Sequence, residues 1–311
     1  MTAAVAVASP PAALTELDAW LTASERRWPD IRPESEARIV WASGEVRERP
    51  LALVYLHGFS ASRMETAPFC DRIAARLDAN VFYARLTGHG RSDPGAMGEA
   101  SVDAWYDDAR RALEVGARIG RRVILVGTST GGTLATLEAA TRDLPELAAL
   151  VLLAPNFGVA DPRAFLLKLP GARRWLPWVV GAERVIEAQH DAHARYWSLR
   201  YPVAAMVPMM HLVTAVWRAP LERIEAPVLA MFAEEDKVVD ARRTRALLAR
   251  MNRAAVTIET LPPLGDGSDH VVVGNAFAPQ NTPAAVERCL AFLEQHGITA
   301  HAESRPAAEL L

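Results

Sequence analysis

The sequence predicts an α/β fold, a mostly parallel sheet with helices on both faces. Short apolar runs of strand length alternate along the chain with stretches of helical spacing, which is the rhythm of a parallel sheet. At the centre, the apolar run Val123–Val126 leads into the turn Gly127–Gly131, and Leu134 and Leu137 follow at helical spacing. With 311 residues, 50% of them hydrophobic, the chain can bury a large core.

The first half of the chain supplies most of the expected elements. Residues 1–12 are expected to be disordered, and three leucines and a tryptophan share one face of an expected helix at 14–27. Short apolar runs predict strands at 39–41, 51–56, 81–84, 123–126 and 149–153. Helices are expected at 64–77, at 102–119 and after Ser129, where apolar residues recur near helical spacing.

The alternation stops at Pro155. Residues 156–220 hold six prolines and half of the chain's tryptophans but no convincing strand, which favours short helices inserted over an edge of the sheet. The pattern then resumes, with strands expected at 226–232 and 255–261 and helices at 241–251 and 282–296. The expected division is an N-terminal extension with a helix (1–36), a core (37–155 and 221–297), a helical cap or lid (156–220) and a C-terminal tail (298–311).

Composition narrows the partners and the compartment. A net charge of −3 provides no field that would attract nucleic acid. The N-terminus has no basic region typical of a signal peptide, and no apolar run approaches the roughly 18 residues that a membrane span needs. We therefore expect a cytoplasmic protein without stable membrane insertion, and the sequence leaves its oligomeric state open.

No metal or other cofactor is expected. Cys70 and Cys289 lie among apolar residues in expected helices, so they suit buried positions and form neither a disulfide framework nor a metal site. His190 and His193 have the spacing of a ligand pair, but no third ligand is evident and solvent exposure is the simpler expectation. No glycine-rich dinucleotide fingerprint precedes a helix.

Ser129 is the candidate nucleophile. It is the central residue of a G-x-S-x-G turn between an expected strand and an expected helix, and such a turn strains the serine backbone and exposes its hydroxyl. Gly127 and Gly131 have no Cβ, so the strand and the helix can pass close together. The amide dipoles of the following helix point at any developing negative charge.

A serine hydroxyl needs a general base, and among the eight histidines His270 fits best. It follows the last expected strand in a Gly/Asp loop, late in the chain, as a base above the carboxyl edge of the sheet should. Asp269 is its neighbour in sequence, so the Asp269 side chain is expected to point elsewhere. The acid that orients the base should follow the strand at 228–232, which leaves four candidates: Glu234, Glu235, Asp236 and Asp240.

Five motifs occur together along the chain: His57-Gly58-Phe59, Thr87-Gly88-His89-Gly90-Arg91-Ser92, Gly127–Gly131, Glu235-Asp236-Lys237-Val238-Val239 and Ser268-Asp269-His270. Because these motifs occur in this order, the chain resembles the serine α/β-hydrolases over roughly residues 47–296. Within them it is most similar to the branch of carboxylesterases and monoacylglycerol lipases. The resemblance implies an eight-stranded, mostly parallel sheet with a helical cap inserted after strand 6. It also selects Asp236 as the acid.

Two backbone amides, those of Phe59 and Thr130, are expected to form the oxyanion hole. The chain has only His57-Gly58 where some lipases have an HGGG loop, which disfavours bulky or tertiary-alcohol esters. In the cap, apolar and adaptable side chains suit an acyl chain, or else simply form the core of the cap. They are Met206, Met209, Met210 and Trp217.

The expected function is hydrolysis of a small-molecule carboxylic ester through an acyl-enzyme, on short- to medium-chain acyl esters or monoacylglycerols. Thioesterases, C–C hydrolases, aminopeptidase-like amidases and acyltransferases use the same triad and stay open. Ser129 argues against dehalogenases and epoxide hydrolases of this fold, which use an aspartate nucleophile. The non-enzymatic alternative is a ligand-binding receptor or scaffold, but such proteins usually lose a triad residue, and all three are present here.

Overall fold

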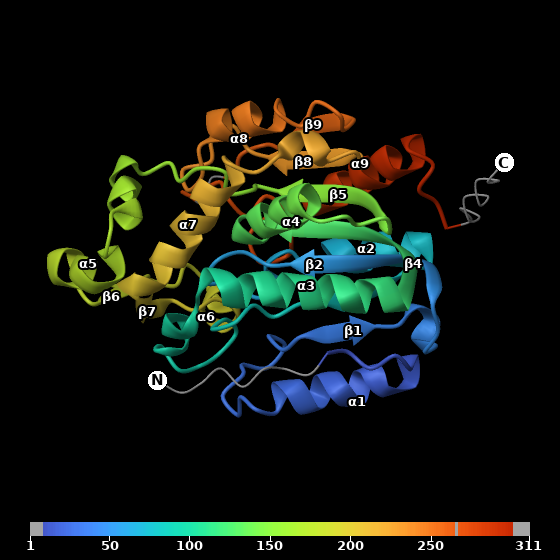
Figure 1. The fold of residues 1–311 in the computed structure, drawn as a ribbon, viewed down its shortest axis with the longest axis horizontal. Coiled ribbons are helices and arrows are strands. Elements are labelled where there is room, and N and C mark those ends of the chain that lie inside the picture. The colour runs from blue at the N-terminus through green and yellow to red at the C-terminus, as the bar shows by residue number, and fades with distance from the viewer. Residues whose placement is uncertain (1–8, 265–266, 301–311) are drawn as a thin grey trace.

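A seven-stranded sheet forms the centre of the computed structural model, which describes residues 9–264 and 267–300 (Figure 1). The strand order is β1-β3-β2-β4-β5-β8-β9; β1 is antiparallel to β3 and all other neighbours are parallel. The strands are β1 (Arg38–Val40), β2 (Arg49–Leu56), β3 (Asn80–Tyr83), β4 (Gly120–Thr128), β5 (Leu147–Leu153), β8 (Val228–Phe232) and β9 (Val256–Thr260). The mostly parallel α/β fold predicted from the sequence is confirmed.

The strand count implied by the resemblance differs from the structure. Eight strands were expected, whereas the described residues form seven in this sheet, and the inserted segment follows β5, the fifth strand, rather than a sixth. The chain before β1 contributes a helix, α1 (Leu14–Glu25), instead of a further strand. The seven apolar runs in the sequence therefore matched the sheet better than the family pattern did.

Helices cover the sheet, as parallel strands buried on both faces require. They are α2 (Phe69–Leu77), α3 (Val102–Ile119), α4 (Thr130–Thr141), α8 (Ala241–Leu248) and α9 (Thr282–Gln295). The pairs α3 with α4 and α2 with α9 pack against each other, and α3 and α4 lie in front of the strands in Figure 1. The helix expected at 64–77 is shorter, because a 3₁₀ turn at Arg63–Glu65 and Pro68 precede α2.

The segment between β5 and β8 contains a 3₁₀ helix, η4 (Pro162–Lys168), then α5 (Ala172–Val180), β6 (Glu183–Val185), α6 (Asp191–Tyr196), β7 (Arg200–Pro202) and α7 (Met206–Val216). The expectation of no strand here was wrong, since β6 and β7 form an antiparallel pair. Each is only three residues long, too short for an alternating pattern to show. α7 packs on α4, whereas α5 and β6 project beyond the end of the sheet (Figure 1).

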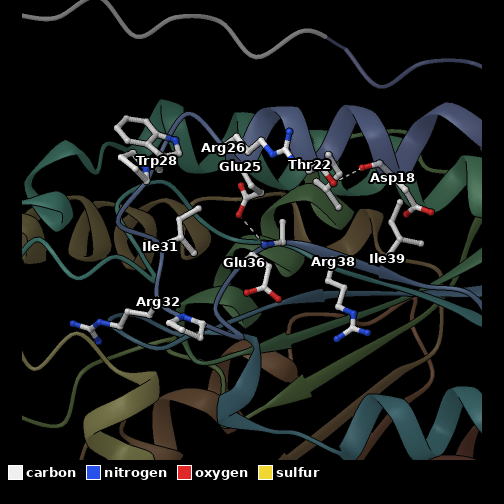
Figure 2. Close-up of a pocket in the computed structure, with 14 residues that line it drawn as sticks. Asp18, Thr22, Glu25, Arg26, Trp28, Ile31, Arg32, Glu36, Arg38 and Ile39 are labelled. Atoms are coloured by element: carbon white, nitrogen blue, oxygen red, sulfur yellow. Dashed lines mark hydrogen bonds between the residues drawn. The ribbon is translucent and has the colours of Figure 1, made fainter.

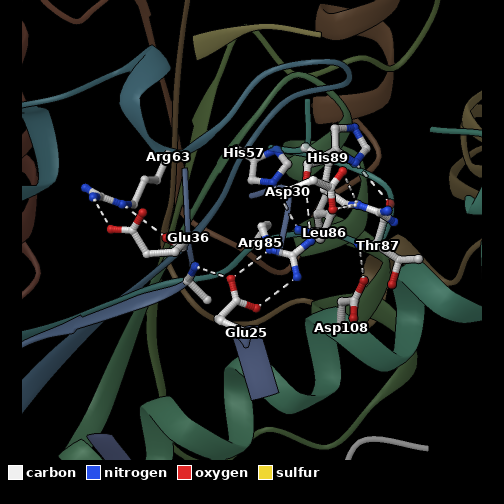
Figure 3. Close-up of polar contacts among 12 residues, drawn as sticks. Glu25, Asp30, Glu36, His57, Arg63, Arg85, Leu86, Thr87, His89 and Asp108 are labelled. Carbon is white, nitrogen blue, oxygen red and sulfur yellow. Dashed lines mark hydrogen bonds and ion pairs between the residues drawn. The ribbon is translucent and has the colours of Figure 1, made fainter. Parts of the chain in front are cut away.

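Buried charges hold the N-terminal helix on the sheet (Figure 3). The guanidinium of Arg85, after β3, donates to both carboxylate oxygens of Glu25 on α1 at 2.7 and 2.9 Å. The Glu25 carboxylate also accepts from the amide of Ala37 at 2.9 Å. The expected disorder of residues 1–12 and the expected tail at 298–311 fall mostly outside the described residues, and the domain division remains a prediction.

Candidate active site

Ser129 lies at the sharp turn between β4 and α4. Its backbone has φ 50° and ψ −114°, a region that a residue with a Cβ rarely adopts. A Cβ added to Gly131 would lie 2.0 Å from the carbonyl oxygen of Leu56, and one added to Gly127 would lie 2.6 Å from that of Gly131. Glycine is therefore required at both positions for the strand and helix to meet at this turn.

Asp236 and His270 are hydrogen-bonded to each other. Asp236 follows β8, and its Oδ2 is 2.7 Å from Nδ1 of His270. The other oxygen, Oδ1, accepts from the amides of Val238 and Val239 at 2.8 and 2.9 Å. These two amides fix the carboxylate, so that its remaining oxygen faces the imidazole.

Two of the other acidic candidates near β8, Glu234 and Asp240, have different partners. Glu234 pairs with Arg245, and Asp240 caps α8 by accepting from the amide of Arg242 at 3.0 Å. Asp269 is buried, but its Oδ1 accepts from the amide of Leu264 at 2.7 Å. Its side chain thus orders the loop that carries His270, as expected of a residue that does not point at its neighbour.

Ser129 and Asp236 follow β4 and β8, two strands separated by β5, at one edge of the sheet. β4, β5 and β8 are adjacent, the amide of Ser129 donates to Leu153 O at 2.9 Å, and the amide of Ala154 donates to Met231 O at 2.7 Å. These hydrogen bonds continue the ladder beyond the strands and align their carboxyl ends.

Glu65 is a buried carboxyl group at this edge that sequence reasoning missed. It is 2% exposed, and its Oε1 accepts from the amide of Gly58 at 2.6 Å and from the hydroxyl of Tyr55 at 2.7 Å. A Cβ added to Gly58 would lie 2.9 Å from Glu65 Oε2 and 3.3 Å from Ser129 Cβ. The carboxyl group and the serine side chain therefore border the same small space beside Gly58. Nothing in the local pattern distinguishes Glu65 from an exposed glutamate.

Burial raises the pKa of Glu65 to about 7, because the charged form loses its hydration. The hydrogen bonds from Gly58 and Tyr55 and the charge of His270 oppose this rise in pKa. Ser129 and His270 therefore both lie near this carboxyl group: Ser129 borders the space beside Gly58 that Glu65 also borders, and the charge of His270 acts on Glu65. Tyr55 extends the network to Thr128, the residue before the serine, at 2.9 Å.

His57 is held by the amide of Leu86 on one side (Figure 3) and fixes the orientation of the Phe59 amide on the other. Its Nε2 accepts from the amide of Leu86 at 3.0 Å, so the proton is on Nδ1, which lies 2.9 Å from Gly58 O. In the trans peptide between Gly58 and Phe59, the N–H points opposite to that carbonyl. Burial lowers the pKa of His57 to about 4, so the ring stays neutral around pH 7 and keeps this pattern.

Of the two expected oxyanion donors, Thr130 directly follows Ser129 in the chain, and Phe59 follows Gly58, where an added Cβ would lie 3.3 Å from Ser129 Cβ. Gly58 N is already bonded to Glu65, which leaves Phe59 as the next amide of that loop. Thr130 is the first residue of α4, so its amide has no acceptor within the helix. The ring of Phe59 contacts Trp105 and His89 of the core and Tyr201 of β7, with centroids 5.3–6.2 Å apart.

The four apolar cap candidates occupy two environments. Met209 and Met210 are buried in the main core on α7, while Met206 is half-buried and packs in a cluster with Phe59. Trp217 is half-buried and donates from Nε1 to Phe157 O at 2.6 Å. Met206 is thus the member that packs against the same cluster as an expected oxyanion residue, and the role of all four in acyl binding remains a prediction.

The expectation that His190 and His193 face solvent was wrong. Their Nδ1 atoms accept from the amides of His193 and Gln189, at 3.1 and 3.3 Å. Both rings pack on Phe277, with centroids 4.6 and 5.1 Å apart. Within the residues that the structure describes, no group of three or more His, Cys, Asp or Glu side chains is arranged to hold a metal ion.

A separate open cavity of about 790 Å³ lies between α1 and residues 28–39 (Figure 2). Asp18, Thr22 and Arg26 line it from the helix, and Ile31 and Arg32 from the following segment. No residue of the candidate active site lines this cavity. The hydrogen-bonded pair Asp236 and His270 lies outside this cavity, at the sheet edge.

Solved structures show the same fold. A structure described for LipS and LipT, two metagenome-derived lipolytic enzymes, is 21% identical, with a TM-score of 0.66, over 86% of this chain and 100% of that chain. Monoacylglycerol lipase from Paleococcus ferrophilus is 16% identical, with a TM-score of 0.61, over 84% and 98% of the two chains. A soluble variant of monoglyceride lipase from Saccharomyces cerevisiae is 14% identical, with a TM-score of 0.62, over 84% and 91%.

No curated protein matches the chain in sequence. None of the helices within residues 9–264 and 267–300 is long and apolar enough to cross a membrane. Residues 48–265, more than half of the chain, match the family Hydrolase_4, described as serine aminopeptidase, S33. The chain therefore belongs to this family of serine hydrolases with the α/β-hydrolase fold.

Proposed function

We propose that the protein is a carboxylic ester hydrolase in which Ser129 is the nucleophile, His270 the general base and Asp236 the acid that orients it. The observation that carries this proposal is the 2.7 Å hydrogen bond between Asp236 and His270, at the sheet edge where Ser129 occupies its strained turn. A nucleophile, a base and a group that orients the base are the parts that acyl transfer requires.

The reaction proceeds through an acyl-enzyme. His270 takes the proton from the Ser129 hydroxyl, whose oxygen attacks the ester carbonyl, and the imidazolium then protonates the leaving alcohol. Water, deprotonated by the same imidazole, attacks the acyl-enzyme and releases the acid and the free serine. Asp236 stays ionised and stabilises the imidazolium that forms in both halves.

The amides of Phe59 and Thr130 bind the oxyanion of each tetrahedral intermediate. His57 and Glu65 are positioning residues for this loop, because one bonds Gly58 O and the other Gly58 N. The charge of ionised Glu65 also favours the imidazolium of His270. A loop held on both sides does not need to reorganise when charge develops.

Short- to medium-chain acyl esters or monoacylglycerols are the proposed substrates. Met206, half-buried against the same cluster as Phe59, is flexible and apolar and suits an acyl chain in this part of the site. Structural neighbours that are lipolytic or act as monoacylglycerol lipases support this class. The short His57-Gly58 loop disfavours bulky alcohol groups.

Aminopeptidase activity is the second candidate, favoured by the family description itself. An amide substrate would use the same triad, with His270 protonating an amine in place of an alcohol. Matched p-nitrophenyl esters and p-nitroanilides of the same acyl group separate the two candidates. Faster turnover of the anilide, relative to its uncatalysed rate, would favour the peptidase.

The decisive variant is Ser129→Ala, assayed with p-nitrophenyl butyrate. We expect kcat to fall by about 10⁴–10⁶, while Ser92→Ala, at an exposed loop serine, leaves kcat within about twofold. A fluorophosphonate probe should label the wild type at Ser129 and leave the variant unlabelled. Retention of more than a few per cent of activity in Ser129→Ala would remove Ser129 from the mechanism, and absence of labelling would favour the receptor alternative.

A further inference from the structure

Large hydrophobic side chains are exposed together on one part of the cap segment. We call these six residues the outer cap patch: Phe165, Leu169, Trp178, Val179, Val180 and Val185, which are 40–90% exposed. In the rest of the described chain, only Val46 and Val238 are comparably exposed large hydrophobic residues. Single exposed side chains are ordinary, but a cluster of this kind marks an interaction surface.

The patch is built on elements that pack against each other. Phe165 lies on η4 and Trp178 on α5, and these two helices are in contact. On α5, Ala172 and Leu176 are buried, whereas Arg174 and Trp178, four residues apart, are exposed together on the other side. The helix thus buries one apolar face in the cap and presents tryptophan and arginine outward, at the projecting end seen in Figure 1.

The same stretch carries an excess of positive charge. Residues 161–185 contain five cationic side chains and two acidic ones, although the whole chain has a net charge of −3. Both acids are already paired, Asp161 with Arg163 at 2.8 Å and Glu183 with Arg200 at 2.7 Å. The cations are Arg163, Lys168, Arg173, Arg174 and Arg184.

An anionic lipid surface complements both properties of the patch. Tryptophan and valine side chains partition into the boundary between head groups and acyl chains, and each arginine or lysine near negative head groups adds about 1 kcal/mol of attraction. A second copy of the chain fits less well, because a twofold contact would bring the same positively charged patch against itself.

We propose that the outer cap patch docks the protein peripherally on membranes that contain anionic lipids. Docking through α5 would leave the sheet outside the bilayer, consistent with the absence of a membrane-spanning helix among the described residues. The proposal goes beyond the proposed reaction and does not depend on it, since binding can be measured on Ser129→Ala protein.

The test is co-sedimentation of the full chain with phosphatidylcholine vesicles, with and without phosphatidylglycerol. We expect at least about tenfold tighter binding to the mixed vesicles, weakened by high salt because the attraction is screened. The triple variant Trp178→Ser, Val179→Ser, Val180→Ser should lose at least about tenfold in affinity for the mixed vesicles. The double variant Lys168→Gln, Arg174→Gln should lose most of the preference for phosphatidylglycerol.

Val46→Ser, at a hydrophobic residue of similar exposure remote from the patch, is the matched control and should bind vesicles like the wild type. The triple variant should keep its thermal midpoint, which shows that it is folded. Equal vesicle binding by the triple variant and the wild type would overturn the proposal, as would no binding of the wild type. So would a triple variant that changes only the oligomeric state in light scattering, since that result assigns the patch to a second copy.

Discussion

The turn around Ser129 and the outer cap patch are opposite extremes of the same molecule. At the turn, the backbone is strained at φ 50°, and a single added methyl group on Gly131 would collide with the backbone of β2. At the patch, Trp178 is 90% exposed. The contrast shows that surrounding contacts hold the serine turn in a costly conformation, whereas the side chains of the patch are 40–90% exposed.

The inner part of the cap resembles the turn around Ser129, because it too is packed against the loops of the candidate site. Trp197, after α6, forms a cluster with Ala61 of the loop after β2 and with Val271 next to His270. The amide of Ser198 donates to Ser60 O at 2.7 Å. The segment between β5 and β8 therefore has one side that packs on the loops around His270 and Ala61 and another side, the outer cap patch, that is exposed.

The largest expected effect is at the triad. Asp236→Asn should lower kcat by about 10⁴, because an amide favours the wrong tautomer of His270 while its shape is preserved. Asp240→Asn, which changes only the cap of α8, should leave kcat within about threefold. Steady-state kinetics on a p-nitrophenyl ester measure both, and a loss below tenfold in Asp236→Asn would contradict the assignment of the acid.

Gly131→Ala should destabilise the fold by at least about 4 kcal/mol or prevent folding. Alanine normally stabilises a helix relative to glycine, but here its Cβ would meet two backbone carbonyl oxygens, 2.0 and 2.6 Å away. Gly98→Ala is the control, since its nearest contact is a proline side-chain atom at 3.5 Å. Urea unfolding distinguishes them, and an unchanged midpoint in Gly131→Ala would refute the tight approach.

Glu65→Gln should stabilise the protein at high pH and slow the reaction. The folded pKa of about 7 lies above the ordinary value of 4.5, so the stability associated with this group is complete below pH 4.5 and is lost as the pH rises through 7. Glutamine avoids this loss, and we expect a gain of roughly 3 kcal/mol at pH 9 and none at pH 4.

At pH 8, kcat of Glu65→Gln should fall by about tenfold, the equivalent of one pKa unit, because the charge beside His270 is lost. Unfolding curves at several pH values and a kcat profile measure the two effects separately. A variant whose stability gain is the same at pH 4 and pH 9 would show that burial of charge is not the cause. Glu36→Gln, at a surface ion pair with Arg63, is the control.

The smallest expected effect is at the outer cap patch. Trp178→Ala should change the free energy of unfolding by less than about 0.5 kcal/mol, because the side chain buries almost no surface. Trp197→Ala, which removes a side chain only 7% exposed, should cost about 3–5 kcal/mol. Denaturant curves compare the two, and equal losses would show that Trp178 is also packed in solution.

Much of the core was predictable because its signals are local. Continuous apolar runs gave the seven strands of the sheet, and the two glycines gave the turn at Ser129. The loop carrying Phe59 and the late position of His270 were also predictable from motif order. Their catalytic roles remain predictions, although the structure places Asp236 against His270.

The sequence by itself determined the alternation of strands and helices and the tight serine turn, because both depend on residues close together along the chain. Only the tertiary structure decided that Glu65 is buried near Ser129, that His190 and His193 pack on Phe277, and that Trp178 faces outward. The physical reason is that burial, and with it the pKa of a carboxyl group, depends on which distant segments meet. The helical or strand spacing of apolar residues in the sequence does not reveal which distant segments come into contact.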